Sequence, residues 1–280
     1  MQKKLIILSL IGFIVVSGNL FAQQHTDCDR LFLQAVQADD NNKVREHLDH
    51  FWGNLNVQDT VGRTGLMIAI EKGNRQMVEF ILNANKSVIN TDVEDQRGMT
   101  ALMYAVDKGN PIIMQILLEE KYGVNVNFQT KGQRNTALHY AVEKKRTDMV
   151  LELLRNKSTQ TTLTDSRGET AFMIAVRTGQ RNMIRLFGNS PGFDVTARPE
   201  GMAIAEGIPP LLQAMQENYP PNVIQDILAF RGAVNSEDTY GNGVYEYLEA
   251  SKYSARNKQI IRGYIEDADK RDGALRNTNY

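Results

Sequence analysis

The sequence has little of several residue types on which particular functions depend. Its 280 residues include one cysteine, one tryptophan and four histidines. The single cysteine, Cys28, excludes a disulfide within the chain and a cysteine-rich metal site. The 32 basic and 33 acidic side chains nearly cancel, so composition gives no reason to expect nucleic acid or an acidic membrane surface as partner. The sequence contains no H-E-x-x-H, phosphate-binding loop, G-x-S-x-G or C-x-x-C motif, so we expect a non-enzymatic protein without a cofactor.

A long apolar run occurs at the N-terminus. Lys3 and Lys4 precede the apolar residues 5–16, and a short stretch of mostly small residues then ends at Ala22. This order is typical of a secretory signal that is removed, which predicts a mature chain beginning at Gln23. An uncleaved membrane anchor fits less well, because the run is shorter than the ~20 residues that span a bilayer. We therefore expect export to the bacterial periplasm or beyond, with no membrane span after cleavage.

Cys28 has two interpretations in an exported protein. Its thiol can pair with another chain, or it can be an inert residue near a frayed terminus. The preceding residues, HTD, are unlike those of a bacterial lipoprotein signal. We expect an inert thiol and a monomeric protein.

One sequence pattern recurs four times at a nearly constant interval. It reads DTVGRTGLMIAIEKGN from Asp59, DQRGMTALMYAVDKGN from Asp95, TKGQRNTALHYAVEKK from Thr130 and DSRGETAFMIAVRTGQ from Asp165. The threonines before the apolar run are 36, 36 and 34 residues apart, at Thr64, Thr100, Thr136 and Thr170. An interval of this size indicates stacked supersecondary units and not a catalytic motif.

Each copy predicts a tight turn followed by two short helices. The turn glycine suits a positive φ, and the threonine two residues later suits a helix N-cap. These turn glycines are Gly62, Gly98 and Gly168. A second set of glycines is placed to end the first helix in the left-handed conformation, at Gly73, Gly109 and Gly179. Apolar pairs four residues apart, such as Met77 and Ile81, mark the second helix. Because two short helices cannot cover their own apolar faces, the units must stack.

The pattern resembles the ankyrin repeat, whose signature is D-x-x-G-x-T-P-L-H-x-A, a glycine, a second helix and G-A-D-V-N. TALHYA from Thr136 and GVNVN from Gly123 match it, and fainter copies lie on both sides of the four strong ones. Glycine or alanine replaces the family's proline, and its histidine is kept only as His139. The resemblance implies an all-α fold, an ankyrin repeat solenoid of about seven stacked helix-turn-helix units with short hairpin fingers.

The repeats set the expected domain boundaries. These are a signal peptide at 1–22, an N-terminal capping repeat at 23–58, four well-formed repeats at 59–188, an irregular loop or extended finger at 189–208, a degenerate repeat at 209–237, a C-terminal capping repeat at 238–268 and a tail at 269–280. The final helix is expected at Gln259 to Asp267. The irregular segment, Asn189 to Ile208, is either a place where a partner touches or a tolerated insertion.

The histidines are the remaining candidates for chemistry. His47 and His50 lie three residues apart, as a metal pair on one helix face would. However, His47 occupies the place where other units carry a core Leu or Ile, so we expect a packing role and no metal site. The resemblance implies that His139 bonds to Thr136 or to the turn backbone, and we expect no catalytic residue. A metal-dependent enzyme built on the N-terminal histidines and the irregular segment is the least favoured function.

The resemblance also implies a concave groove that binds a partner. Carried over unit by unit, that groove presents Val61, Arg63, Glu71, Lys72, Arg97, Met99, Asp107, Lys108, Gln133, Asn135, Glu143, Lys144, Arg167, Glu169, Arg177 and Thr178. Seven of these side chains are basic and four are acidic. Such an excess would steer an acidic partner, although a solvated face of mixed charge explains it equally well.

These observations favour a protein-protein interaction scaffold in the periplasm or cell envelope, whose partner is an unidentified protein and not a nucleic acid. In the alternative function, the chain is also an interaction scaffold, but it is a secreted effector that binds host proteins.

Overall fold

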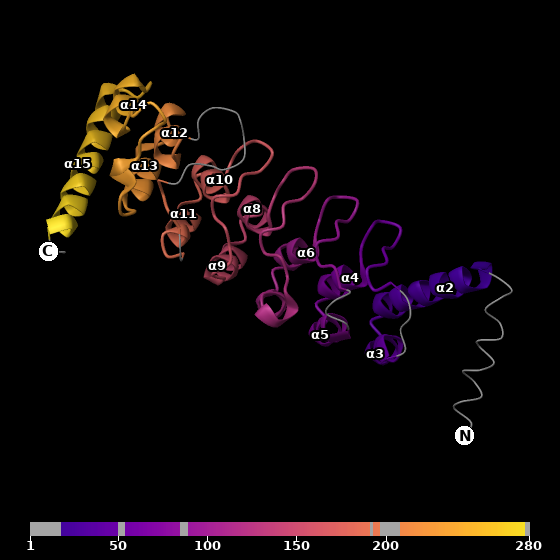
Figure 1. Cartoon of the computed structure of the whole chain (residues 1–280). Helices are drawn as coiled ribbons and strands as arrows, with labels where there is room; N and C mark the ends of the chain where they lie inside the picture. The colour runs from indigo at the N-terminus through magenta and orange to yellow at the C-terminus, as the bar shows by residue number, and fades with distance from the viewer. Residues whose placement is uncertain (1–17, 50–53, 85–88, 191–192, 197–207, 278–280) are drawn as a thin grey trace. The chain divides into compact units, whose positions relative to one another are not determined.

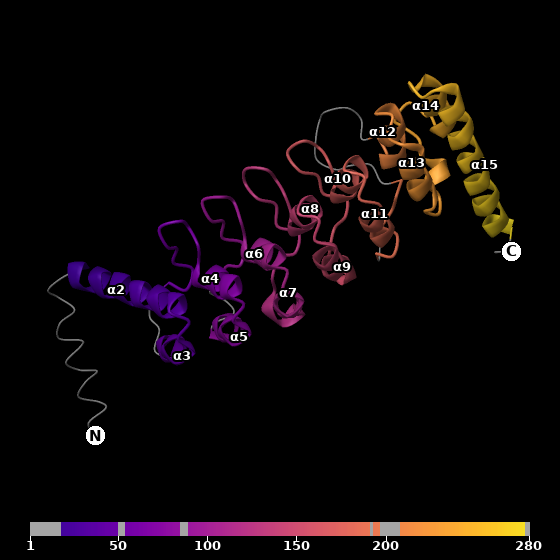
Figure 2. The same ribbon diagram turned by 180° about the vertical axis from the view of Figure 1, so that it is seen from behind.

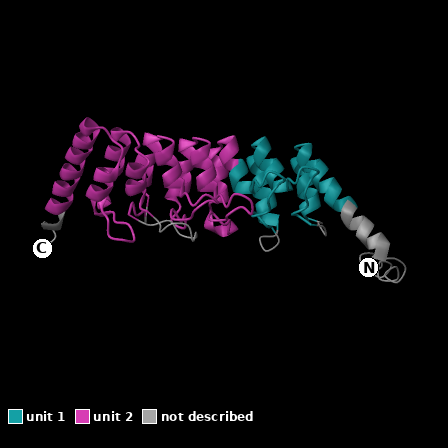
Figure 3. Cartoon of the chain, turned by 90° about the horizontal axis from the view of Figure 1, so that it is seen from above, with its two compact units in different colours: residues 1–104 teal, residues 105–280 magenta. Residues whose placement is uncertain are grey.

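The computed structural model describes residues 18–49, 54–84, 89–190, 193–196 and 208–277. The chain divides into two compact units, residues 1–104 and residues 105–280 (Figure 3). The charged and apolar parts of the expected signal peptide lie outside the described residues. The expected cleavage position after Ala22 falls within the first described helix, α2 (Gly18–Gln37).

The first unit contains two helix pairs and the start of a third. These are α2 with α3 (Asn41–Asp49), α4 (Gly65–Lys72) with α5 (Arg75–Ala84), and the first residues of α6 (Ala101–Lys108). Helix α2 contacts α3 and α4, and α5 contacts α3 and α4, so each pair packs on the next. The capping repeat expected at 23–58 contains α3 and all of α2 except its first five residues.

The second unit continues the same order of helix pairs. It holds the end of α6, α7 (Pro111–Leu117), α8 (Ala137–Glu143), α9 (Thr147–Arg155), α10 (Ala171–Arg177), α11 (Arg181–Phe187), α12 (Pro210–Gln216), α13 (Pro221–Leu228), α14 (Val244–Ala250) and α15 (Ala255–Asn277), with 3₁₀ turns at Glu120–Tyr122 and Ala233–Asn235. Helices α8, α10, α12 and α14 contact one another in sequence order, as do α9, α11 and α13. Figures 1 and 2 show these as two layers, with the hairpin loop before α10 projecting beyond the first.

The seven helix pairs found among the described residues confirm the predicted all-α repeat solenoid. In the part of the chain that the structure describes there is no strand, only isolated bridges such as those joining Gln58 to Thr64 and Thr164 to Thr170. Each bridge closes a hairpin finger in front of a first helix.

The turn and cap chemistry predicted from the repeats is confirmed. The hydroxyl oxygens of Thr64, Thr136 and Thr170 accept hydrogen bonds from the backbone N–H three residues later, at 3.2–3.4 Å. These bonds satisfy donors that the first turn of a helix leaves unpaired. Gly62, with φ 85°, and Gly73, with φ 71°, represent the two sets of left-handed glycines.

Two non-glycine residues adopt the left-handed conformation in the third strong copy, which begins at Thr130. Lys145, with φ 57°, ends α8 where the other copies have glycine. Arg134, with φ 54°, is the left-handed residue of the hairpin, although Gly132 lies two residues before it. This hairpin is one residue longer than the others, because Thr136 follows Thr130 by six positions, whereas Thr100 follows Asp95 by five. The extra residue moves the left-handed position off the glycine.

The core follows the predicted apolar stripe. Leu138, Ala141 and Phe172 in the second unit, and Leu66 and Ala69 in the first, are buried. Alanine at the centre of the stripe lets neighbouring first helices approach closely. Each pair therefore covers the apolar face of the next, as the repeat interval requires.

An aromatic cluster fills the second unit where the repeat interval stretches. Phe172 packs against Phe187, Phe193 and Phe230 with ring centroids 4.9–5.8 Å apart. Phe193 belongs to the irregular segment, of which residues 191–192 and 197–207 lie outside the described residues. The cluster anchors the described part of this segment to α10, to α11 and to Phe230 in the turn after α13.

Helix α15 is longer than predicted. It runs to Asn277, through most of the segment expected to be a tail. The sequence there is rich in charge, which obscured a buried stripe formed by Ile261, Ile265, Ala268 and Asp272. Asp272 is held by the N–H of Gly232 at 2.8 Å and by Arg271, so a charged residue contributes to this packing.

Candidate functional site

In the first unit, four of the six predicted groove residues line one concavity. It has a volume of about 340 Å³ and is lined by Val61, Arg63, Glu71, Asp95, Gln96, Arg97 and Tyr104. Four of these seven were predicted from the resemblance, and they come from two successive hairpin loops and the end of α4. Asp95, Gln96 and Tyr104 were not predicted. Asp95 was assigned to the turn alone, and Tyr104 replaces the isoleucine of the preceding copy.

Both arginines of this concavity are held in place by carboxylates. Arg63 lies between Asp59, at 2.8 Å, and Glu71, at 2.5 Å. Arg97 donates through Nε to Asp95 at 3.2 Å and through Nη2 to the hydroxyl of Tyr104 at 2.9 Å. The Arg97 side chain nevertheless remains 65% exposed. It is a fixed cationic group that faces solvent.

The tyrosine hydroxyl completes this arrangement. Tyr104 donates to Asp95 Oδ2 at 2.8 Å, while the Arg97 guanidinium lies 5.4 Å from the ring centroid. Burial, together with the hydrogen bond to Asp95, raises the pKa of Tyr104 to about 12. Burial alone would raise the pKa of Asp95, but hydrogen bonds from the Met99 N–H, from Tyr104 and from Arg97 outweigh it, so that pKa is lowered. The pair stays a neutral phenol and a carboxylate at neutral pH.

In the second unit, a network of ion pairs joins four of the predicted residues. Arg167 contacts Glu143 at 3.1 Å, Asp165 at 2.7 Å and Glu169 at 3.2 Å. Arg177 contacts Glu169 at 2.6 Å. Arg167 remains 49% exposed, so it too is a fixed group at the surface.

The other predicted residues of the second unit lie along the same loops and helix ends. Asp107 accepts a hydrogen bond from the Tyr140 hydroxyl at 3.2 Å, and the Lys144 ammonium lies 5.3 Å from the Tyr140 ring centroid. The backbone carbonyl of Gln133 accepts from the Ser166 N–H at 2.8 Å, which ties neighbouring hairpins together. Lys108 is exposed in the last turn of α6, as Lys72 is in the last turn of α4 of the first unit. Thr178 is exposed at the end of α10 and donates to the Ile174 carbonyl at 2.6 Å.

We call these hairpin loops and the last turns of the first helices that follow them the loop surface. It carries charges of both signs. Each of three hairpin carboxylates, Asp59, Asp95 and Asp165, is paired with an arginine. When these carboxylates are counted together with Lys131 and Arg134 of the longer hairpin, the loop surface has nine basic and seven acidic side chains. The basic excess is therefore two and not three, and an acidic partner stays a prediction.

Met99 does not present its side chain at the loop surface. It is only 6% exposed, and its N–H donates to Asp95 Oδ1 at 2.8 Å. The position lies beneath the hairpin. At the equivalent position of other copies, Arg63 is long enough to reach the surface and Glu169 forms an ion pair with Arg177. Methionine is shorter than arginine and has no charge with which to form an ion pair. Asn135, also at this register, is half-buried and donates to Glu143 at 3.5 Å.

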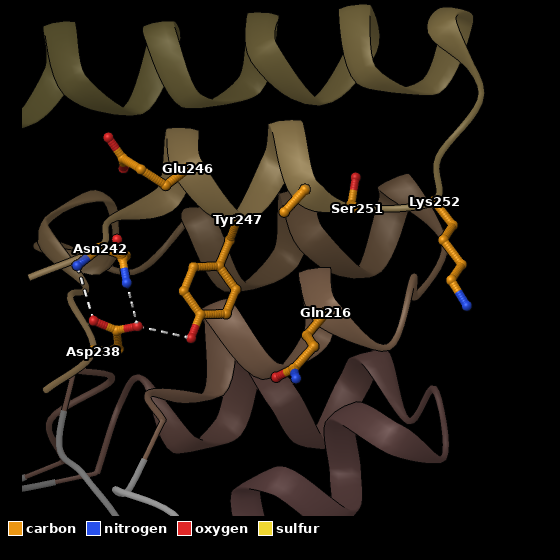
Figure 4. A pocket seen from close by; sticks show the side chains of 8 residues that line it. Gln216, Asp238, Asn242, Glu246, Tyr247, Ser251 and Lys252 are labelled. Atoms are coloured by element: carbon orange, nitrogen blue, oxygen red, sulfur yellow. Dashed lines mark hydrogen bonds between the residues drawn. The ribbon is translucent and has the colours of Figure 1, made fainter. Parts of the chain in front are cut away.

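A larger cavity lies in the second unit at the last repeat. Its volume is about 600 Å³, and it is lined by Gln216, Asp238, Asn242, Glu246, Tyr247, Ala250, Ser251 and Lys252. In Figure 4, Asp238, Asn242 and Glu246 lie on one side of Tyr247, and Ser251 and Lys252 lie on the other. Sequence reasoning missed this cavity because it treated the repeat only as a cap. The sequence signal that could have indicated this cavity is the copy of the turn motif at Asp238.

The histidines show no arrangement for catalysis in the described part of the chain. His139 is 2% exposed, and its ring bonds to Thr136 and to the Glu169 carbonyl, as the resemblance implied. His47 is half-buried in α3, and His50 lies outside the described residues. Among the described residues no group of three His, Cys, Asp or Glu side chains could hold a metal ion. None of the described helices combines the length and the apolar character needed to cross a membrane.

Comparison with known proteins agrees with this geometry. The sequence profile of ankyrin repeats in three copies matches residues 32–130 and 122–199. Among curated proteins, no sequence matches significantly. Of the solved structures, the ankyrin repeat domain of Bcl-3, a member of the IkappaB protein family, is similar with a TM-score of 0.63 at 20% identity. That match covers 83% of this chain and 97% of the other. At this identity the likeness concerns the fold alone.

Proposed function

The chain belongs to the ankyrin repeat family, whose repeats are protein-protein interaction scaffolds, and we propose that it binds a partner protein through the loop surface. The observation that carries the proposal is the state of the surface arginines. Arg97 and Arg167 are each held by two or more carboxylate or hydroxyl contacts, yet their side chains remain 65% and 49% exposed. Binding groups fixed before the partner arrives lose little conformational entropy on association, which favours affinity.

The proposed partner is a folded protein or an extended segment with charges of both signs. The loop surface offers alternating arginines and carboxylates in place of one dominant sign, so complementary charges on the partner would set the register of binding. The exposed apolar side chain of Val61, beside Arg63 and Arg97, adds a hydrophobic contact. A chain of this kind acts by holding another protein and not by transforming a substrate.

We further propose that binding takes place after export, in the periplasm or cell envelope. The support for this is the order of charged, apolar and small residues within residues 1–22. Fractionation of cells that make the full chain tests it. Retention of the processed chain in the envelope agrees with the proposal, and release into the medium favours the alternative, a secreted effector that binds host proteins.

Affinity capture with a matched pair of variants tests the binding surface. The processed chain immobilised on a resin should retain a specific protein from envelope extracts. Reversing the charge of Lys72, Lys108 and Lys144 should weaken retention by about tenfold or more, since several charge contacts are lost together. The control reverses Lys43, Arg75 and Arg155, which are exposed cations of α3, α5 and α9. Equal losses in both triple variants would mean that the loop surface is not the site.

A further inference from the structure

In the second unit, the charge of the loop surface changes sign from one repeat to the next. Helices α8, α10, α12 and α14 contact one another in sequence order, so the hairpin and helix end that belong to each follow in the same order (Figure 1). The charged side chains of these four repeats therefore form a row along the unit.

The row begins with a basic repeat and a balanced one. The repeat of α8 carries three basic side chains and one acidic one, which are Lys131, Arg134, Lys144 and Glu143. Both lysines are exposed. The repeat of α10 carries two side chains of each sign, which are Arg167, Arg177, Asp165 and Glu169, and ion pairs join them. The net charge falls from two positive to zero between these repeats.

The row ends with two acidic repeats. The described part of the repeat of α12 contributes Glu217, which is exposed and accepts a hydrogen bond from the Tyr219 hydroxyl. The repeat of α14 carries three acidic side chains and one basic one, which are Glu237, Asp238, Glu246 and Lys252. Glu249 of the same helix adds no net charge, because Arg262 of α15 pairs with it. The described residues thus carry one negative charge in the repeat of α12 and two in the repeat of α14.

The hydrogen bonds of the last repeat keep its carboxylates charged. Asp238 accepts from the side chain and the N–H of Asn242 and from the N–H of Tyr240, at 2.8–2.9 Å. Glu246 accepts from the Gly243 N–H at 2.9 Å, and it lies on the same side of Tyr247 as Asp238 (Figure 4). Donors of this kind favour the charged form of a carboxylate without cancelling its charge.

Screening by salt makes a partner sensitive to each repeat separately. The Debye length is about 8 Å at physiological ionic strength, and packed helices lie about 8–10 Å apart. A charge on the partner is therefore affected mainly by the repeat beneath it. A uniformly acidic or uniformly basic partner would be attracted at one end of the row and repelled at the other.

We propose that the partner segment bound on the loop surface of the second unit is divided in charge, with an acidic part over the repeat of α8 and a basic part over the repeats of α12 and α14. The part over the balanced repeat of α10 carries little net charge. The inference rests on the proposed function and adds the direction in which the partner lies. Turning the segment round would bring like charges together at both ends of the row, which is unfavourable.

A peptide probe tests this order without the natural partner. It consists of a glutamate block and a lysine block, joined by a Gly-Ser linker that spans three helix spacings, roughly 30 Å. A nitroxide label is placed at the glutamate end in one sample and at the lysine end in the other. Each is mixed with the full chain at low ionic strength, and nuclear magnetic resonance detects which amide signals the label broadens. The glutamate label should broaden signals near Lys131 and Lys144, and the lysine label signals near Glu217 and Glu237.

Charge-reversal variants identify the groups that hold each end. Glu217→Lys with Glu237→Lys should remove the broadening by the lysine label and weaken peptide binding by about tenfold. The matched control is Glu119→Lys with Glu120→Lys, which makes the same change of charge at exposed positions after α7, outside the loop surface. It should bind the peptide as the parent does. Circular dichroism establishes that both variants are folded.

Several results would overturn the proposed charge order. These are the same signals broadened by both labels, the opposite order of the two ends, no site-selective broadening, and equal loss of binding in the variant and its control. The outcome for the proposed function is separate. A captured protein together with a peptide that takes no order would refute the charge order alone, whereas an ordered peptide without any captured protein would count against the proposed function.

Discussion

The Nε2 atom of His139 lies 3.1 Å from the backbone carbonyl oxygen of Glu169, in the hairpin loop of the next repeat. The other ring nitrogen, Nδ1, accepts from the Thr136 N–H at 3.2 Å. A neutral ring protonated at Nε2 satisfies both contacts, whereas a protonated Nδ1 could not accept from the backbone. One histidine therefore caps its own helix and bonds to the following repeat.

This relationship predicts that stability falls in mildly acidic solution. Burial lowers the pKa of His139, although the hydrogen bond to the Glu169 carbonyl opposes the shift. The unfolded chain takes up a proton near pH 6.5, and the folded chain does so only at lower pH, so the free energy of unfolding should decrease as pH falls below ~6.5, by up to about 1.4 kcal/mol per pH unit. The measurement is urea unfolding between pH 7.5 and 5.5.

The control for this prediction is His139→Met. Methionine occupies the same position in the other three strong copies, and its sulfur accepts from the N-cap N–H, as in Met67 at 3.4 Å from the Thr64 nitrogen. The variant should fold, and its free energy of unfolding should decrease much less than that of the parent between pH 7.5 and 5.5. An identical pH profile for parent and variant would show that His139 is not the group responsible.

Lys145→Gly should stabilise the protein. Lys145 holds a left-handed conformation, with φ 57°, that costs a residue bearing a Cβ about 1 kcal/mol. Glycine removes that cost but is more flexible in the unfolded chain, so we expect a net gain of about 0.5 kcal/mol in the free energy of unfolding. The reverse change, Gly179→Lys, is at an equivalent position with open space around it and should destabilise. A loss of stability in Lys145→Gly would mean that the Lys145 side chain makes stabilising contacts that outweigh the cost of its backbone conformation.

Gly188→Ala should destabilise the aromatic cluster. A Cβ at this position would overlap the ring of Phe230. Because cores tolerate overpacking poorly, we expect a loss of about 1–3 kcal/mol. The double variant Gly188→Ala with Phe230→Leu should recover part of that loss, because the smaller side chain makes room. Additive losses in the double variant would contradict the packing described for this cluster.

Leu138→Asp should destabilise severely, because Leu138 is only 2% exposed in the interior of the second unit. Placing an unpaired charge there should cost about 4 kcal/mol or more, as measured by chemical unfolding. Leu138→Ala, which removes contacts without adding a charge, should cost about 2–4 kcal/mol. A loss below about 1 kcal/mol for the aspartate variant would mean that the residue is not interior.

Local chemistry repeated at a fixed interval made most of the fold predictable. The threonine caps and the left-handed glycines have specific backbone requirements, so their recurrence identified the turns and the helix starts. Lys145 and Arg134 escaped prediction because a non-glycine residue in the left-handed region carries no signal in its side chain. The length of helix α15 was underestimated because its highly charged outer face masks a narrow apolar stripe in the sequence.

The candidate site was predicted less completely than the fold. The resemblance located Arg63, Arg97 and Arg167, but the sequence could not show that carboxylates of the hairpin turns hold them. A count of charged residues in the sequence treats each side chain as independent. In the structure many of these side chains form ion pairs with one another, so they are not independent. Met99 was misplaced for a related reason, since a register position does not determine whether a side chain of given length reaches the surface.

Hydrogen exchange of the chain with and without its captured partner tests the central claim, that binding occurs at the loop surface. Binding should slow exchange in the hairpins and first-helix ends, at residues 59–72, 95–108, 130–144 and 165–178. The second helices, residues 75–84, 147–155 and 181–187, should exchange as they do in the free protein. Slowed exchange confined to those second helices, with the hairpins unchanged, would contradict the account.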